Sequence, residues 1–159
     1  MTAEERKAKS VEYIAQIEDW CRKFWNQYEG LHGRDRLCAL IGPGLALTVA
    51  KAKGVTRNDW STTYVSVAID EPAVYIRDYW RDDDPSGFWM PDEYLKQPNN
   101  LLREHKDMSH IYTLLQNWPE VKSRLHESAK LAIAYHEERK AKEKAEVERK
   151  NFIIENFSV

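Results

Sequence analysis

The chain has 159 residues, of which 42% are hydrophobic and 31% are charged, and its formal net charge is −2 at pH 7. This length and composition are typical of one soluble globular domain whose core needs neither disulfides nor a metal. The slightly acidic balance argues against a protein that binds nucleic acid over its whole surface, and no apolar run approaches the roughly 18 residues of a membrane-spanning helix.

The N-terminus and the cysteines indicate a cytoplasmic protein. The first ten residues, MTAEERKAKS, are polar and charged, unlike a secretory signal peptide. The two cysteines, Cys21 and Cys38, are therefore expected to be reduced thiols. Each lies in an apolar segment, which predicts a small buried side chain and not a reactive group.

The first predicted helix begins at a capping box made by Thr2 and Glu5, and Gly30 is expected to end it. Its apolar residues recur at helical spacing, and with Tyr13 and Trp20 they cover about half of the circumference. That arc is wider than a helix packed on one side requires, so the domain, or the domain and a partner, should contact it on two sides. The apolar set is Val11, Ile14, Ile17, Cys21, Phe24, Trp25 and Tyr28.

A second helical region is predicted over Arg34 to Lys53, with a break at Gly42-Pro43-Gly44 because Pro43 cannot continue a helix. A phosphate-binding loop is the alternative interpretation of these glycines. The segment has neither the third glycine of a dinucleotide fingerprint nor the Gly-Lys-Ser/Thr ending of a P-loop.

The segment AKAKGVTRNDW, residues 50–60, resembles the turn of a helix-turn-helix module, because Ala50 and Gly54 have the spacing of that turn. The alternative function is therefore a DNA-binding regulator that uses residues 45–61. Its second helix would enter the major groove and present Arg57, Asn58 and Ser61 to the bases.

A β-element follows. The segment TTYVSVAI, Thr62 to Ile69, is rich in β-branched residues and alternates, which predicts a strand. Asp70-Glu71-Pro72 is a turn signal. Residues 73–80 then form either the second strand of a hairpin or a helix that begins at Pro72, and the periodicity does not decide between them.

Aromatic and acidic residues are concentrated between Tyr75 and Tyr94. Large rings favour burial and clustered carboxylates favour water or a cation, so we expect this stretch at the boundary between core and solvent. The interpretation is an acidic loop, anchored by rings, that binds a partner with a basic surface. Its expected contact residues are Trp80, Asp82, Asp83, Asp84, Phe88 and Trp89.

The same stretch fits a calcium-loop template. Oxygen-bearing side chains fall at the first, third, fifth and twelfth positions, and Gly87 falls at the sixth. The ligands would be Asp82, Asp84, Ser86 and Glu93, which makes Ca²⁺ a candidate cofactor. Trp89 and Pro98 depart from the usual pattern, and a second loop is lacking, so a solvated acidic turn is the alternative.

The C-terminal part is predicted to be helical. One helix follows Asn100, and Pro119 ends it and begins a last helix that reaches about Asn156. In that last helix the packing stripe disappears from Glu137 to Lys150, where acids and bases alternate at i,i+4 spacing. Apolar residues then return, and we expect this apolar end to dock on another subunit or a partner: Phe152, Ile153, Ile154, Phe157 and Val159.

No catalytic or transition-metal motif stands out. The five histidines do not form an H-E-x-x-H pattern, and the chain contains no G-x-S-x-G nucleophile motif. We interpret the five histidines as partly exposed helical residues: His32, His105, His110, His126 and His136.

These patterns together predict a mainly α fold, or α+β with a small hairpin or short strands around residues 62–80. It would be a helical bundle (residues 1–136) with a charged helical extension (residues 137–159). The predicted function is a non-enzymatic protein-interaction module, an adaptor, regulator or inhibitor, with coiled-coil character. It would be a homodimer or a subunit of a complex. Its binding residues would include Phe152, Ile153 and Phe157.

Overall fold

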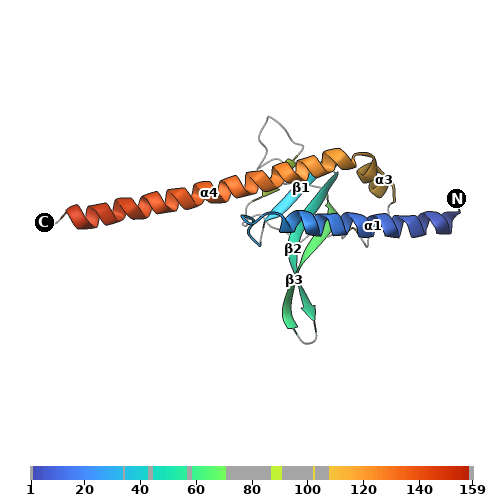
Figure 1. Ribbon diagram of the computed structural model, residues 1–159, viewed down its shortest axis with the longest axis horizontal. Helices are drawn as coiled ribbons and strands as arrows, with labels where there is room; N and C mark the ends of the chain where they lie inside the picture. The colour runs from blue at the N-terminus through green and yellow to red at the C-terminus, as the bar shows by residue number, and fades with distance from the viewer. Residues whose placement is uncertain are drawn as a thin grey trace.

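A computed structural model describes residues 2–33, 35–42, 45–56, 59–70, 87–90, 102 and 108–157, with only the backbone described for residues 42, 52–56, 59–64, 70 and 87–90. The fold is mostly helical, with a small antiparallel sheet and a long C-terminal helix (Figure 1). The elements are α1 (Ala3–Asn26), β1 (Arg36–Gly42), β2 (Leu45–Thr56), β3 (Asp59–Asp70), β4 (Gly87–Met90), α3 (Met108–Gln116) and α4 (Trp118–Asn156).

The strands form one antiparallel sheet in the order β3-β2-β1-β4. β1 and β2 make a hairpin in which Leu37 pairs with Val49, and the register shifts between Leu40 and Gly42. β2 and β3 pair along almost their whole length, and their far ends project beyond the helices as an arm (Figure 1). β4 closes the other edge of the sheet by pairing with β1.

The helix predicted over residues 34–53 is wrong, because β1 and most of β2 occupy this segment. Every second side chain of the hairpin faces the helices, but several of the intervening residues are small and are buried too: Cys38, Ala46, Thr48 and Ala50. A strand that is buried on both faces loses its polar alternation, so its sequence cannot be distinguished from a buried helix by period alone. The helix-turn-helix over residues 45–61 is wrong for the same reason, because β2 and the start of β3 form this region.

The strand predicted over Thr62 to Ile69 is confirmed as the main part of β3. Its hairpin partner is β2, which precedes it in the chain, whereas residues 73–80 lie outside the described part. β4 lies in the stretch that was predicted to be an acidic loop. Gly87 and Pro91 bound only four residues there, too few for alternation to be read.

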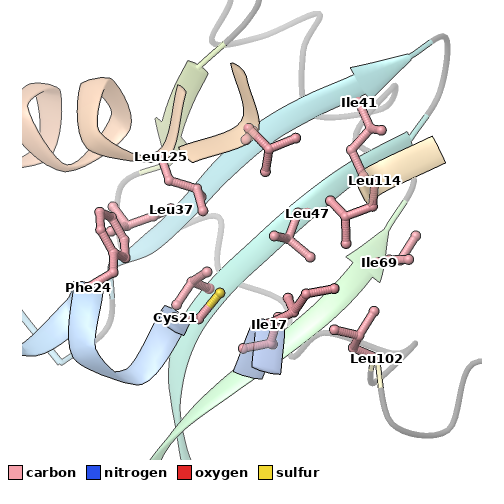
Figure 2. Packing of buried hydrophobic residues seen from close by; sticks show 14 of the residues in the cluster. Ile17, Cys21, Phe24, Leu37, Ile41, Leu47, Ile69, Leu102, Leu114 and Leu125 are labelled. Atoms are coloured by element: carbon pink, nitrogen blue, oxygen red, sulfur yellow. The ribbon is translucent and has the colours of Figure 1, made fainter. Parts of the chain in front are cut away.

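The core lies between one face of the sheet and the helices (Figure 2). α1 contributes Ile17, Cys21 and Phe24 to it, and α4 contributes Leu125. The two helices run in the same direction over this face and are packed on the sheet, so the predicted bundle is replaced by a helical layer on a β-layer (Figure 1). The strand residues facing them are Leu37, Ala39, Ile41, Leu47, Val49, Val67 and Ile69.

The predicted N-terminus of α1 is confirmed and its predicted end is not. Thr2 and Glu5 exchange the two hydrogen bonds of a capping box, each 3.2 Å long. The helix ends at Asn26, four residues before Gly30. Gly30 instead lies against α4, because a Cβ placed on it would come within 3.1 Å of both Cγ atoms of Ile133.

The wide apolar arc of α1 is contacted on two sides, as expected, by the sheet and by α4. Phe24 enters the core, while Trp20 is half-buried and makes an edge-to-face contact with Trp118 at a centroid distance of 5.2 Å. Val11 is the exception, since its side chain is exposed.

α4 has 39 residues and follows Asn117, with Pro119 in its first turn, as predicted. At 1.5 Å per residue it is about 58 Å long. Its buried residues all lie in its first half and are Val121, Leu125, Ser128, Ala129 and Ala132. Among the described helices, none combines the length and the apolar character that crossing a membrane requires.

Candidate functional site: the projecting half of α4

Most of the residues predicted to bind a partner, a metal or DNA are not placed. Trp80, Asp82, Asp83, Asp84, Ser86, Glu93, Arg57 and Asn58 lie outside the described residues. Phe88 and Trp89 lie on β4 and Ser61 lies on β3, each known by its backbone only. Within the described part of the chain, no three potential metal-ligating side chains come together. The one predicted set with described side chains is Phe152, Ile153 and Phe157 on α4.

The second half of α4 is solvated. Every residue from Glu137 to Phe157 is exposed, and Figure 1 shows the helix extending far beyond the sheet. The expected i,i+4 ion pairs are present: Lys142 to Glu138 at 3.2 Å, Arg139 to Glu143 at 3.5 Å and Lys150 to Glu146 at 3.7 Å. Exposed pairs of this kind contribute only about 0.3–0.5 kcal/mol each, enough to favour the helix without fixing it to anything.

The end of this helix exposes large apolar side chains. Phe152 is 66% exposed, Ile153 51%, Ile154 75% and Phe157 73%. They do not fold back onto the described body of the protein. A cluster of four such residues at one helix end is unlike the scattered apolar residues of an ordinary surface.

A buried hydrogen bond between Asp35 and His136 fixes α4 where it leaves the body. Asp35 lies immediately before β1, and its carboxylate accepts a hydrogen bond from Nε2 of His136. That nitrogen lies 2.9 Å from both carboxylate oxygens. The same carboxylate accepts the backbone N–H of His32 at 2.8 Å. Because a carboxylate only accepts, Nε2 of His136 must carry the proton. Two segments 101 residues apart are thereby joined at the root of the projecting helix.

The Asp35–His136 pair is closed to a substrate. The side chain of Asp35 is fully buried and that of His136 is only 11% exposed. The His32 ring covers the His136 ring, with centroids 3.5 Å apart and an interplanar angle of 13°. This geometry resembles the carboxylate–imidazole half of a catalytic triad, but its position makes it an anchor for α4.

A second contact between α1 and α4 is aromatic. Tyr28 Oη lies 2.5 Å from Nδ1 of His126, and the His126 ring packs edge-on against Phe24 at 5.0 Å. Burial, helped by Lys130 and Lys122, lowers the pKa of His126, and burial raises the pKa of the Tyr28 phenol. The Tyr28 hydroxyl donates a hydrogen bond to Nδ1 of a neutral His126. This arrangement satisfies the hydrogen-bonding needs of both side chains.

The two thiols are inert, as predicted. Cys21 and Cys38 are both buried and unbridged. Burial raises the pKa of Cys38 to about 12 and raises that of Cys21 further. Since the thiolate is the reactive form, neither cysteine is a nucleophile in the folded chain.

Inspection of the sequence missed Asp35 and the role of His136. Asp35 stands directly before the run RLCALIG, and its signal is lost if that run is interpreted as helical. Comparison of the chain with protein-family models, curated proteins and solved structures finds no match. The function must therefore be inferred from the geometry of α4 itself.

Proposed function

We propose that this protein is a non-enzymatic interaction module that binds another protein through the projecting half of α4. One observation carries the proposal: a helix anchored at its root by a buried hydrogen bond ends in four large, exposed apolar side chains. Such an end is costly in water and becomes favourable when covered, because burying one side chain of this size contributes about 1.5–3 kcal/mol.

The anchoring supports the same conclusion. A binding helix whose base is fixed loses less conformational freedom on binding than a flexible tail does. The Asp35–His136 pair and the close approach of Gly30 to Ile133 both act at the base, within one turn of the point where α4 becomes fully exposed. The aromatic–acidic stretch around Trp80 to Trp89 stays a prediction for a second contact surface.

Substitution at the helix end tests the proposal in the full-length chain. Ile154→Ser combined with Phe157→Ser removes two exposed apolar side chains without touching the core. Val11→Ser is the matched control, since Val11 is also exposed and apolar but lies on α1. Partners captured from the source cell by the unaltered chain should be lost with the double variant and kept with Val11→Ser.

Equal capture by all three chains would show that the end of α4 does not bind protein. Circular dichroism of each variant checks that the helix content is unchanged.

A further inference from the structure

The charges along the exposed half of α4 are arranged so that the helix complements itself when reversed. Read from Glu137 forward and from Lys150 backward, each acid meets a base or an uncharged residue, and no like charges meet. Glu137 falls opposite Lys150, Glu138 opposite Arg149, and Glu143 opposite Lys144. A helix with this property can pair with a second copy of itself in antiparallel orientation.

A single stripe of α4 carries this complementarity. Residues spaced alternately four and three apart lie on one helical face, as in a coiled-coil seam. Such a stripe runs along the flank of α4, beside the face that packs on the sheet. It consists of Leu131, Tyr135, Glu138, Lys142, Ala145, Arg149, Phe152 and Asn156.

Antiparallel pairing of this stripe, centred between Glu143 and Lys144, forms four kinds of layer, none of which brings like charges together, although Leu131 meets the polar Asn156. Tyr135 packs on Phe152, Glu138 meets Arg149, and Lys142 lies over Ala145. By the two-fold symmetry each layer occurs twice. Beside the stripe, Arg139 of one copy faces Glu146 of the other, so the flanking charges are complementary as well.

Exposure agrees with this register. At the root of α4, the large apolar residues of the stripe are open to solvent, with Leu131 36% and Tyr135 37% exposed. At the far end Phe152 is 66% exposed. The pairing brings these two exposed sets of the same helix together, 17 positions apart in the sequence. The overlap from residue 131 to residue 156 is about 39 Å long at 1.5 Å per residue.

We infer that the partner of the projecting half of α4 is a second copy of this chain, paired antiparallel along the stripe from Leu131 to Asn156. The inference rests on the proposed function and specifies its partner. The existing intrahelical pairs do not oppose it, because Glu138–Lys142 and Arg139–Glu143 are solvent-exposed and weak. Ile154 and Phe157 lie outside the stripe and take no part in the pairing.

Charge reversal in the full-length chain tests the register, with the mass measured by sedimentation velocity over a range of concentrations. In the Glu138→Arg variant, the introduced arginine of each copy faces Arg149 of the other, so the dimer contains two Arg–Arg contacts. In the Arg149→Glu variant, the same two contacts are between glutamates. Each variant alone should dimerise on the order of a hundredfold more weakly than the unaltered chain. Mixing the two variants pairs Arg with Glu in all four positions and should restore the dimer mass.

The mixing step separates a register effect from simple damage to the helix, because a damaged helix is not repaired by mixing. Lys140→Glu is the control, since Lys140 lies outside the stripe, and it should leave the dimer intact. A chain that stays monomeric at every concentration, a dimer that Glu138→Arg does not weaken, or a mixture that stays monomeric would each overturn the inference.

The proposed function and this inference fail separately. If the unaltered chain is monomeric and the Ile154→Ser, Phe157→Ser variant still loses captured partners, the self-pairing is wrong and the binding function stands. If the dimer forms in the stated register but that variant captures the same partners as the unaltered chain, the inference holds and the foreign-partner role of the helix end fails.

Discussion

The Asp35–His136 hydrogen bond at the root of α4 gives the sharpest test of how the projecting helix is held. In the His136→Ala variant the buried Asp35 carboxylate loses the Nε2–H that lies 2.9 Å from both of its oxygens, and it keeps the backbone N–H of His32. Removing the partner of a buried hydrogen-bonding group costs about 1–3 kcal/mol, because the remaining acceptor loses a bond that water does not replace. A domain of this size has only about 5–15 kcal/mol of stability to lose.

The assay is urea unfolding followed by tryptophan fluorescence, with a thermal melt beside it. His136→Ala should lower the melting temperature by about 2–12 °C. This follows from a loss of about 1–3 kcal/mol in unfolding free energy and a shift of about 2–4 °C for each kcal/mol lost. Glu137→Ala is the control, since Glu137 is the next residue and is exposed. It should change stability by less than about 0.5 kcal/mol.

A double-mutant cycle completes the test. Asp35→Asn removes the buried charge, so His136→Ala should cost at least about 1 kcal/mol less in that background than in the unaltered chain. If the two substitutions are additive, or if His136→Ala is no worse than Glu137→Ala, the anchoring role of the pair is refuted.

Three further predictions follow from the packing of α1, β1 and α4. Gly30→Ala should destabilise the fold by about 1–3 kcal/mol through its clash with Ile133, and chemical unfolding should show a smaller cost in an Ile133→Ala background, whereas equal costs would contradict the contact. Cys21 and Cys38 should react with a thiol reagent at pH 8 only after unfolding, so fast labelling of the native chain would contradict their burial. Because the pKa of His126 is lowered in the fold, the unfolded chain takes up a proton first, and the unfolding free energy should fall as the pH drops below about 6.5. His126→Asn should flatten that fall between pH 5 and 7, and an unchanged slope would count against the assignment.

Local chemistry explains which elements the sequence predicted correctly. The capping box at Thr2 and Glu5 needs only residues three apart, and Pro119 excludes a continuous helix regardless of its surroundings. The alternation of β3 and the i,i+4 charges of α4 are likewise short-range patterns. All four are present in the structure.

The hairpin of β1 and β2 was missed because its signal depends on tertiary context. Cys38, Ala46 and Thr48 are buried on the face of the sheet opposite the helices, so the polar alternation that would mark a strand is absent. Asp35 was missed for a related reason. Its partner His136 lies 101 residues away, and nothing local distinguishes a buried carboxylate from a solvated one.

The end of α4 was predicted from sequence to dock on another subunit or a partner, and the structure shows its apolar side chains exposed. The sequence predicted a homodimer, but it gave no register or orientation for the pairing. The antiparallel register that we propose combines the exposure of Phe152 with the reversed charge pattern between Glu137 and Lys150, which has meaning only once α4 is known to be one uninterrupted, projecting helix.

Distances between spin labels on two copies of the full-length chain test the central claim most directly. One variant carries Lys144→Cys and the other Asn151→Cys, each labelled in the native state, where Cys21 and Cys38 are buried. In the antiparallel pair, the two labels at position 144 lie near the pairing centre. The two labels at position 151 are separated by about 22 Å along the helix axis, because each residue from the centre adds about 1.5 Å on each of the two helices. We predict a short distance at position 144 and a clearly longer one at position 151. Equal distances at both positions, or no interaction between copies, would contradict the account.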